Sequence, residues 1–163
     1  MRFVLLIAAF LFLYSCATVE SNEISFTTDV SGEMMFEGAN TLQGSGSEVV
    51  SGLAGKLEIK KNQITDLRIT EVEIKMPDAD RDITESLLLQ IVSDGNELMS
   101  LGSLNPVPSE GAILLNMAED TQVLNHLRDE GSTWVLDLNL SEDHMEEMSV
   151  TVNFKGEVEY KQE

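Results

Sequence analysis

Residues 133–140, with the sequence TWVLDLNL, place a large apolar side chain at every second position: Trp134, Leu136, Leu138 and Leu140. Residues 148–160, MSVTVNFKGEVEY, repeat this pattern through Val150, Val152, Phe154, Val158 and Tyr160. A period of two is typical of β-strands that bury one face and expose the other to water. Strands with one wet face predict an antiparallel sheet, because parallel sheets are buried on both faces.

The same patterning extends outward over most of the chain. It covers residues 24–30, 67–76 and 113–117, whereas residues 87–92 form a continuous apolar run that precedes a further expected strand at residues 98–104. The apolar phase reverses between Ile69 and Val72, which predicts a bulge or bend near Thr70 and Glu71. Asp94-Gly95 separates two apolar runs and predicts a hairpin turn.

Two segments have helical spacing instead. In residues 120–131, Asp120 or Thr121 is a candidate cap for a short helix that ends at Gly131. In residues 47–57 the apolar positions also fit a helix, but Gly52 and Gly55 each disfavour it by about 1 kcal/mol relative to alanine. A strand over residues 56–60 is the alternative there.

These patterns predict an all-β fold. We expect an antiparallel β-sandwich of the immunoglobulin-like type with one or two short helices, and a closed β-barrel is the alternative. The interior distinguishes them, because a sandwich fills its core with side chains while a ligand-binding barrel keeps a pocket. The run Gly44-Ser45-Gly46-Ser47 is interpreted as a flexible linker. The methionine run Met34-Met35 and the adjacent Phe36 are expected to fill core gaps, as are Met76, Met99 and Met117.

The N-terminus is a leader peptide rather than part of this domain. Arg2 precedes an apolar run over residues 3–14, which has the length of a secretory signal and is too short to span a bilayer. The segment resembles the signal peptides of bacterial lipoproteins, because Leu13, Ser15 and Cys16 match their lipobox, although Tyr14 departs from its usual small or aliphatic residue.

That resemblance implies how the N-terminus is processed and where the protein is located. It implies cleavage before Cys16, diacylglycerol on its thiol and an acyl group on its new amino terminus. Ala17, where an aspartate tends to retain such proteins in the inner membrane, implies an outer-membrane anchor in the cell envelope, on its periplasmic or surface face. We therefore expect a cleaved signal at residues 1–15, a lipidated N-terminus and short linker at residues 16–23, and one β-sandwich domain at residues 24–163. The mature chain also resembles small envelope lipoproteins with immunoglobulin-like sandwiches in texture, which assigns no family.

The chain is strongly acidic. It has 29 Asp and Glu against 10 Lys and Arg, a formal charge of -19, which becomes -20 when Arg2 leaves with the leader. Nucleic acid is excluded as a partner, since a phosphate backbone requires clustered basic residues. The expected membrane contact is therefore the lipid anchor alone.

Two acidic segments are weak candidates for metal binding. Asp78, Asp80 and Asp82 have the alternate spacing of calcium ligands, but the glycine and the distal glutamate of an EF-hand loop are missing, so we expect a solvated turn. His144 lies among carboxylates and two methionines in residues 141–149, which would suit zinc or copper. We expect that segment to be a mobile, projecting acidic loop.

No catalytic motif is present in the sequence. His126 is expected to be a partly exposed helix residue, and no G-x-S-x-G nucleophile elbow occurs. We therefore expect no enzyme activity and no cofactor beyond the lipid on Cys16. The hypothesis is an envelope lipoprotein that acts as an interaction or accessory module with an unidentified protein partner. The alternatives are an apolar-ligand-binding barrel and a cation-dependent adhesive or carbohydrate-binding domain.

Overall fold

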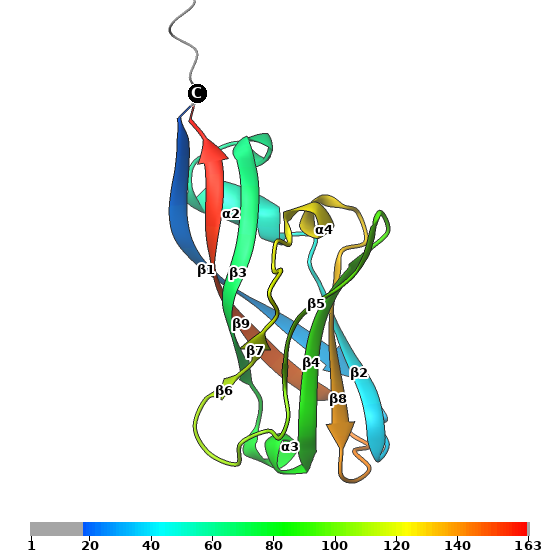
Figure 1. Cartoon of the computed structure of the whole chain (residues 1–163). Coiled ribbons are helices and arrows are strands. Elements are labelled where there is room, and N and C mark those ends of the chain that lie inside the picture. The colour runs from blue at the N-terminus through cyan, green and yellow to red at the C-terminus, as the bar shows by residue number, and fades with distance from the viewer. Residues whose placement is uncertain (1–17, 163) are drawn as a thin grey trace, which may run out of the picture.

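The computed structural model describes residues 18–162 (Figure 1). The leader and Cys16 lie outside these residues. Strands form most of the described chain, and short helices connect some of them. In chain order the elements are β1 (Val19–Gly32), β2 (Gly38–Ser45), α2 (Val49–Lys56), the 3-10 turn η1 (Lys61–Gln63), β3 (Ile64–Lys75), α3 (Asp78–Ile83), β4 (Thr84–Ser93), β5 (Asn96–Leu104), β6 (Ile113–Leu114), β7 (Asn116–Met117), α4 (Leu124–Arg128), β8 (Thr133–Leu140) and β9 (Met148–Lys161).

The strands form one antiparallel sheet in the order β6-β3-β9-β1-β2-β8-β4-β5-β7. The all-β antiparallel prediction is confirmed. β1 pairs with β9 along its whole length, from Val19↔Lys161 to Gly32↔Met148, but pairs with β2 only at Ser31↔Gln43. This narrow junction joins the β3-β9-β1 side to the β2-β8-β4-β5 side. The sheet nearly closes on itself, which agrees with the barrel alternative rather than with two separate sheets.

One short segment bridges the two outer edges of the sheet. Ile113 and Leu114 pair with β3, whereas Asn116 and Met117 pair with β5. Between these pairs, the Leu115 amide donates to the carbonyl oxygen of Val72 at 3.1 Å. The strand expected over residues 113–117 is therefore split into β6 and β7, because its two halves satisfy the backbone groups of opposite edges.

Side chains from both sides of the sheet fill the interior. Trp134 is fully buried, as its place on an apolar strand face predicted, and its ring centroid lies 4.6 Å from that of Phe154. Phe26 stacks on Phe154 at 4.7 Å. Helices α2 and α4 add buried side chains to this core, including Leu53 and Leu127.

Two local predictions, a bulge and a hairpin turn, are confirmed. The pairing of β3 with β9 shifts register between Ile69 and Glu71, where a bulge was predicted. Ser93 pairs with Asn96, so Asp94-Gly95 forms the predicted hairpin turn. Opposite the bulge Gly156 is required, because a Cβ there would collide with the Arg68 carbonyl oxygen.

Three predicted boundaries are wrong. Residues 19–23 belong to β1 rather than to a linker, because they pair with the end of β9. Gly44 and Ser45 belong to β2, and Gly46 is buried, so this run is not a flexible linker. Helix α4 has Val123 as its N-cap rather than Asp120 or Thr121, because Thr121 and Val123 first hydrogen-bond to β3. Over residues 47–57 the helical alternative is the one observed, as α2.

Truncation of Trp134 tests the packing of the core. Trp134→Ala removes the central ring of the aromatic cluster, so we expect the free energy of unfolding in urea to fall by about 3 to 5 kcal/mol. Leu98→Ala is the control, since Leu98 is 55% exposed and should change stability by less than about 0.5 kcal/mol. Equal effects of the two substitutions would contradict the assigned core.

Candidate functional site

Two connections meet at the end of the molecule opposite the described termini (Figure 1). We call them together the distal tip: residues 33–37, between β1 and β2, and residues 141–147, between β8 and β9. Met35 and His144 exchange two backbone hydrogen bonds, each 2.9 Å long. The amide of Glu37 also donates to Asp143 Oδ1 at 2.9 Å. Residues 141–147 are thus docked on the neighbouring turn, which corrects the expected projecting loop.

The side chains beside the bridge differ in exposure. Met35 is 3% exposed and packs into the core, whereas Met34 is 65%, Phe36 58% and Met145 57% exposed. Met34 and Met145 each adjoin one residue of the bridged pair Met35↔His144, so both lie beside the bridge. The prediction of a core role for Met34 and Phe36 is therefore wrong, and three large apolar side chains face water at one end of the protein.

Backbone and side-chain bonds fix this arrangement. The Asn40 side chain accepts a bond from the Phe36 amide at 3.0 Å and donates to the Phe36 carbonyl at 2.6 Å. Met34 has a positive φ of 51°, a conformation that costs free energy for a residue with a side chain. The surrounding bonds hold the turn in this conformation.

The tip is rimmed by acids. Its two segments contain Glu33, Glu37, Glu142, Asp143, Glu146 and Glu147, all exposed, and no Lys or Arg. The acidic residues of residues 141–147 stand out in the sequence, but their proximity to those of residues 33–37 does not, because the two segments are more than 100 positions apart in the chain. The one sequence signal of this surface is the run Met34-Met35-Phe36, which glutamates flank on both sides.

The candidate metal ligands are only partly brought together. Residues 78–83 form helix α3, which places Asp80 on the buried side while Asp78 and Asp82 are exposed. The solvated turn is therefore wrong for Asp80, whose Oδ1 lies 3.9 Å from His144 Nε2. Within residues 18–162 no group of three or more His, Cys, Asp or Glu is placed to share a metal ion.

His126 is also buried rather than partly exposed. It is 5% exposed, and its Nε2 donates to the carbonyl oxygen of Glu97 at 2.7 Å. This contact joins α4 to β5, a long-range neighbour that helical periodicity cannot reveal. The ring therefore has a structural partner.

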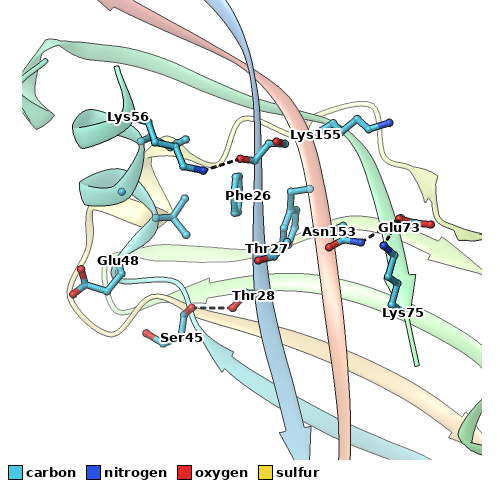
Figure 2. A pocket seen from close by; sticks show the side chains of 15 residues that line it. Phe26, Thr27, Thr28, Ser45, Glu48, Lys56, Glu73, Lys75, Asn153 and Lys155 are labelled. Carbon is cyan, nitrogen blue, oxygen red and sulfur yellow. Dashed lines mark hydrogen bonds and ion pairs between the residues drawn. The ribbon is translucent and has the colours of Figure 1, made fainter. Parts of the chain in front are cut away.

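A cleft of about 730 Å³ lies beside α2 (Figure 2). Phe26, Leu53 and Phe154 give it an apolar lining, and the last two of these are almost fully buried. Lys56 Nζ donates to the carbonyl oxygen of Ser25 at 3.3 Å. An apolar lining beside an ammonium group is the chemistry that suits a small amphiphilic anion.

Two other lysines of the cleft are paired with carboxylates. Lys155 Nζ lies 2.6 Å from Glu71 Oε1, and Lys75 Nζ lies 3.6 Å from Glu73 Oε2. The hydrogen bond to Glu71 raises the pKa of Lys155, because the neighbouring carboxylate favours the ammonium form. Their positive charge is thus already balanced within the protein.

The lipidation candidate Cys16 lies outside the described residues, but the strand that follows it is well defined. Val19 pairs with Lys161, and the Thr18 carbonyl accepts a bond from the Gln162 amide at 3.1 Å. Tyr160 Oη donates to Glu20 Oε2 at 2.9 Å, and this bond raises the pKa of Tyr160. Within residues 18–162 no helix has both the length and the hydropathy to cross a bilayer.

The aspartates of α3 can be tested with cations. We expect millimolar Ca²⁺ and Mg²⁺ to raise the melting temperature by the same small amount, because both only screen the repulsion between surface carboxylates. Calorimetry of the wild type and of an Asp78→Asn, Asp82→Asn variant, which leaves the buried Asp80 intact, makes the comparison. A calcium-selective rise that this variant loses would instead indicate a specific site.

Comparison with known proteins assigns no family. No protein-family model matches the chain, and no curated protein matches it. Among solved structures, a chain from Desmodium yellow mottle tymovirus aligns with 11% identity and a TM-score of 0.36 over 92% of this chain and 93% of the viral one. A chain from turnip yellow mosaic virus aligns with 10% identity and a TM-score of 0.31, over 86% and 95% respectively. Likenesses this distant carry no argument about function.

Proposed function

We propose that this chain is a non-enzymatic envelope lipoprotein, held to the outer membrane by acylated Cys16, whose barrel domain serves as an interaction module. The observation that carries the proposal is the course of β1. Three residue steps separate Cys16 from Val19, and β1 continues unbroken to Gly32 at the distal tip. One strand thus links the lipidation site to the opposite end of the molecule.

This course supports one orientation of the proposed lipoprotein on its membrane. Three residue steps span at most about 10 Å, so the end that contains Val19 and Lys161 would lie against the membrane. The 14 residues of β1 have a contour length of about 43 Å at about 3.3 Å per residue. The distal tip would therefore be presented away from the lipid surface.

The side chains support a binding role better than a catalytic one. His126 is buried and bonds to the carbonyl oxygen of Glu97, whereas His144 Nε2 lies 3.9 Å from Asp80 Oδ1 without a hydrogen bond. The tip, in contrast, combines exposed apolar side chains with a fixed backbone, and exposed apolar groups gathered in one place are typical of interaction surfaces. The charge of -20 disfavours direct adsorption to anionic lipid, so the anchor would supply the membrane affinity.

Removal of the acylation site tests the anchor. Cys16→Ser should move the protein from the membrane fraction to the soluble fraction and abolish labelling by radioactive fatty acid. The reason is that two or three acyl chains contribute about 0.8 kcal/mol per buried CH₂, and nothing else on this acidic surface replaces them. Ser15→Ala, which keeps a small residue before the cysteine, is the matched control and should stay with the membrane. Membrane retention of the Cys16→Ser protein would reject the proposal.

A further inference from the structure

We propose that the distal tip is a docking surface for another protein, whose own contact surface has an apolar centre ringed by Lys and Arg. This inference deepens the proposed function, on which it rests for the direction in which the tip points. The tip combines an apolar centre, a fixed backbone and a single sign of charge.

The apolar centre is a cluster rather than scattered exposure. Within residues 18–162 the large apolar residues that stand exposed are Val19, Met34, Phe36, Leu98, Leu114 and Met145. Three of these six lie in the two bridged segments of the tip, and the other three lie on separate strands. Met34 and Met145 each adjoin one residue of the bridged pair Met35↔His144, which keeps the two exposed side chains in the same part of the surface. Methionine side chains adapt readily to a partner's shape.

The backbone beneath this surface is already ordered. Two backbone hydrogen bonds join Met35 to His144, one joins Glu37 to Asp143, and two join Asn40 to Phe36. The backbone of the tip therefore loses little further freedom on binding. Met35 is buried under the same turn and fixes it to the core. A preorganised surface loses less conformational freedom when it binds, and this favours a specific contact.

Charge decides among the possible occupants. The six exposed carboxylates of the tip lie in the same two segments as the apolar side chains, and these segments contain no Lys or Arg. A second copy of this chain would bring six more carboxylates against them, and an anionic lipid surface would also be repelled. A protein with Lys and Arg around an apolar patch would be attracted and steered.

Photocrosslinking of the full-length lipoprotein in its own cells tests the proposal. p-Benzoylphenylalanine replaces Phe36 in one strain and, as the matched control, the equally exposed Leu98 in another. We expect a covalent adduct with another protein from position 36 only. Mass spectrometry should map it to an apolar surface flanked by Lys and Arg.

A charge variant completes the test. Glu33→Gln, Glu37→Gln, Glu146→Gln and Glu147→Gln together should lower adduct formation about tenfold, because rim charges steer association. The comparison variant neutralises four exposed glutamates elsewhere: Glu48, Glu119, Glu130 and Glu157. It has the same net charge and should leave the adduct unchanged.

Several outcomes would overturn the docking surface. These are no adduct from position 36, an adduct with lipid or with a second copy, equal adducts from positions 36 and 98, or a mapped surface without basic residues. Fractionation of the same cells distinguishes failure of the docking proposal from failure of the proposed membrane anchor. Protein that stays in the membrane but forms no adduct rejects only the tip, whereas an adduct formed by protein that is soluble rejects only the membrane anchor.

Discussion

The ladder between β1 and β9 is the constraint on which the rest of the structure depends. Fourteen consecutive residue pairs, from Val19↔Lys161 to Gly32↔Met148, join the beginning of the described chain to its end. The ladder places Phe26 opposite Phe154, and these two rings with Trp134 form the aromatic centre of the core. The other edge of β9 pairs with β3, so loss of the β1–β9 ladder would separate both β9 and β3 from β1.

An acidic chain can hold such a barrel because the charges stay outside and the interior is apolar. The fully buried residues are overwhelmingly aliphatic or aromatic, and burial of each large side chain contributes about 1.5 to 3 kcal/mol. Repulsion among surface carboxylates opposes folding, and local pairs such as Lys155 with Glu71 reduce it only where they occur. The two segments of the distal tip contain no Lys or Arg that could reduce this repulsion, so negative charge is concentrated there.

Period-two patterning predicted the strands well because burial alternates along them. In β8 and β9 the buried positions are those that the sequence indicated, including Trp134 and Phe154. The bulge near Glu71 and the turn at Asp94-Gly95 were also predicted, since both leave a local signal. The helix over residues 49–56 was one of two alternatives, and the burial of its Val50, Leu53 and Ala54 in the core favours it despite its glycines.

Features that depend on distant partners could not be read from the chain. The start of β1 is polar, and it is a strand because it pairs with the end of β9, where Glu20 and Asn22 hydrogen-bond to Tyr160. The burial of His126 depends on β5, and the distal tip exists only because Met35 meets His144. The near-closure of the sheet could not be predicted either, because it depends on residues 113–117 pairing with both outer edges.

In the proposed orientation the two ends of β1 lie at different heights above the membrane, and this difference can be measured. In the proposed lipoprotein the thiol of Cys16 is blocked by its lipid, and the chain has no other cysteine, so a cysteine introduced as Lys161→Cys or Glu37→Cys could be labelled alone with a fluorophore. Quenching by nitroxide attached to lipid headgroups then reports contact with the surface. The account predicts strong quenching at position 161 and none at position 37. Equal quenching at both positions, or quenching at position 37 alone, would contradict it.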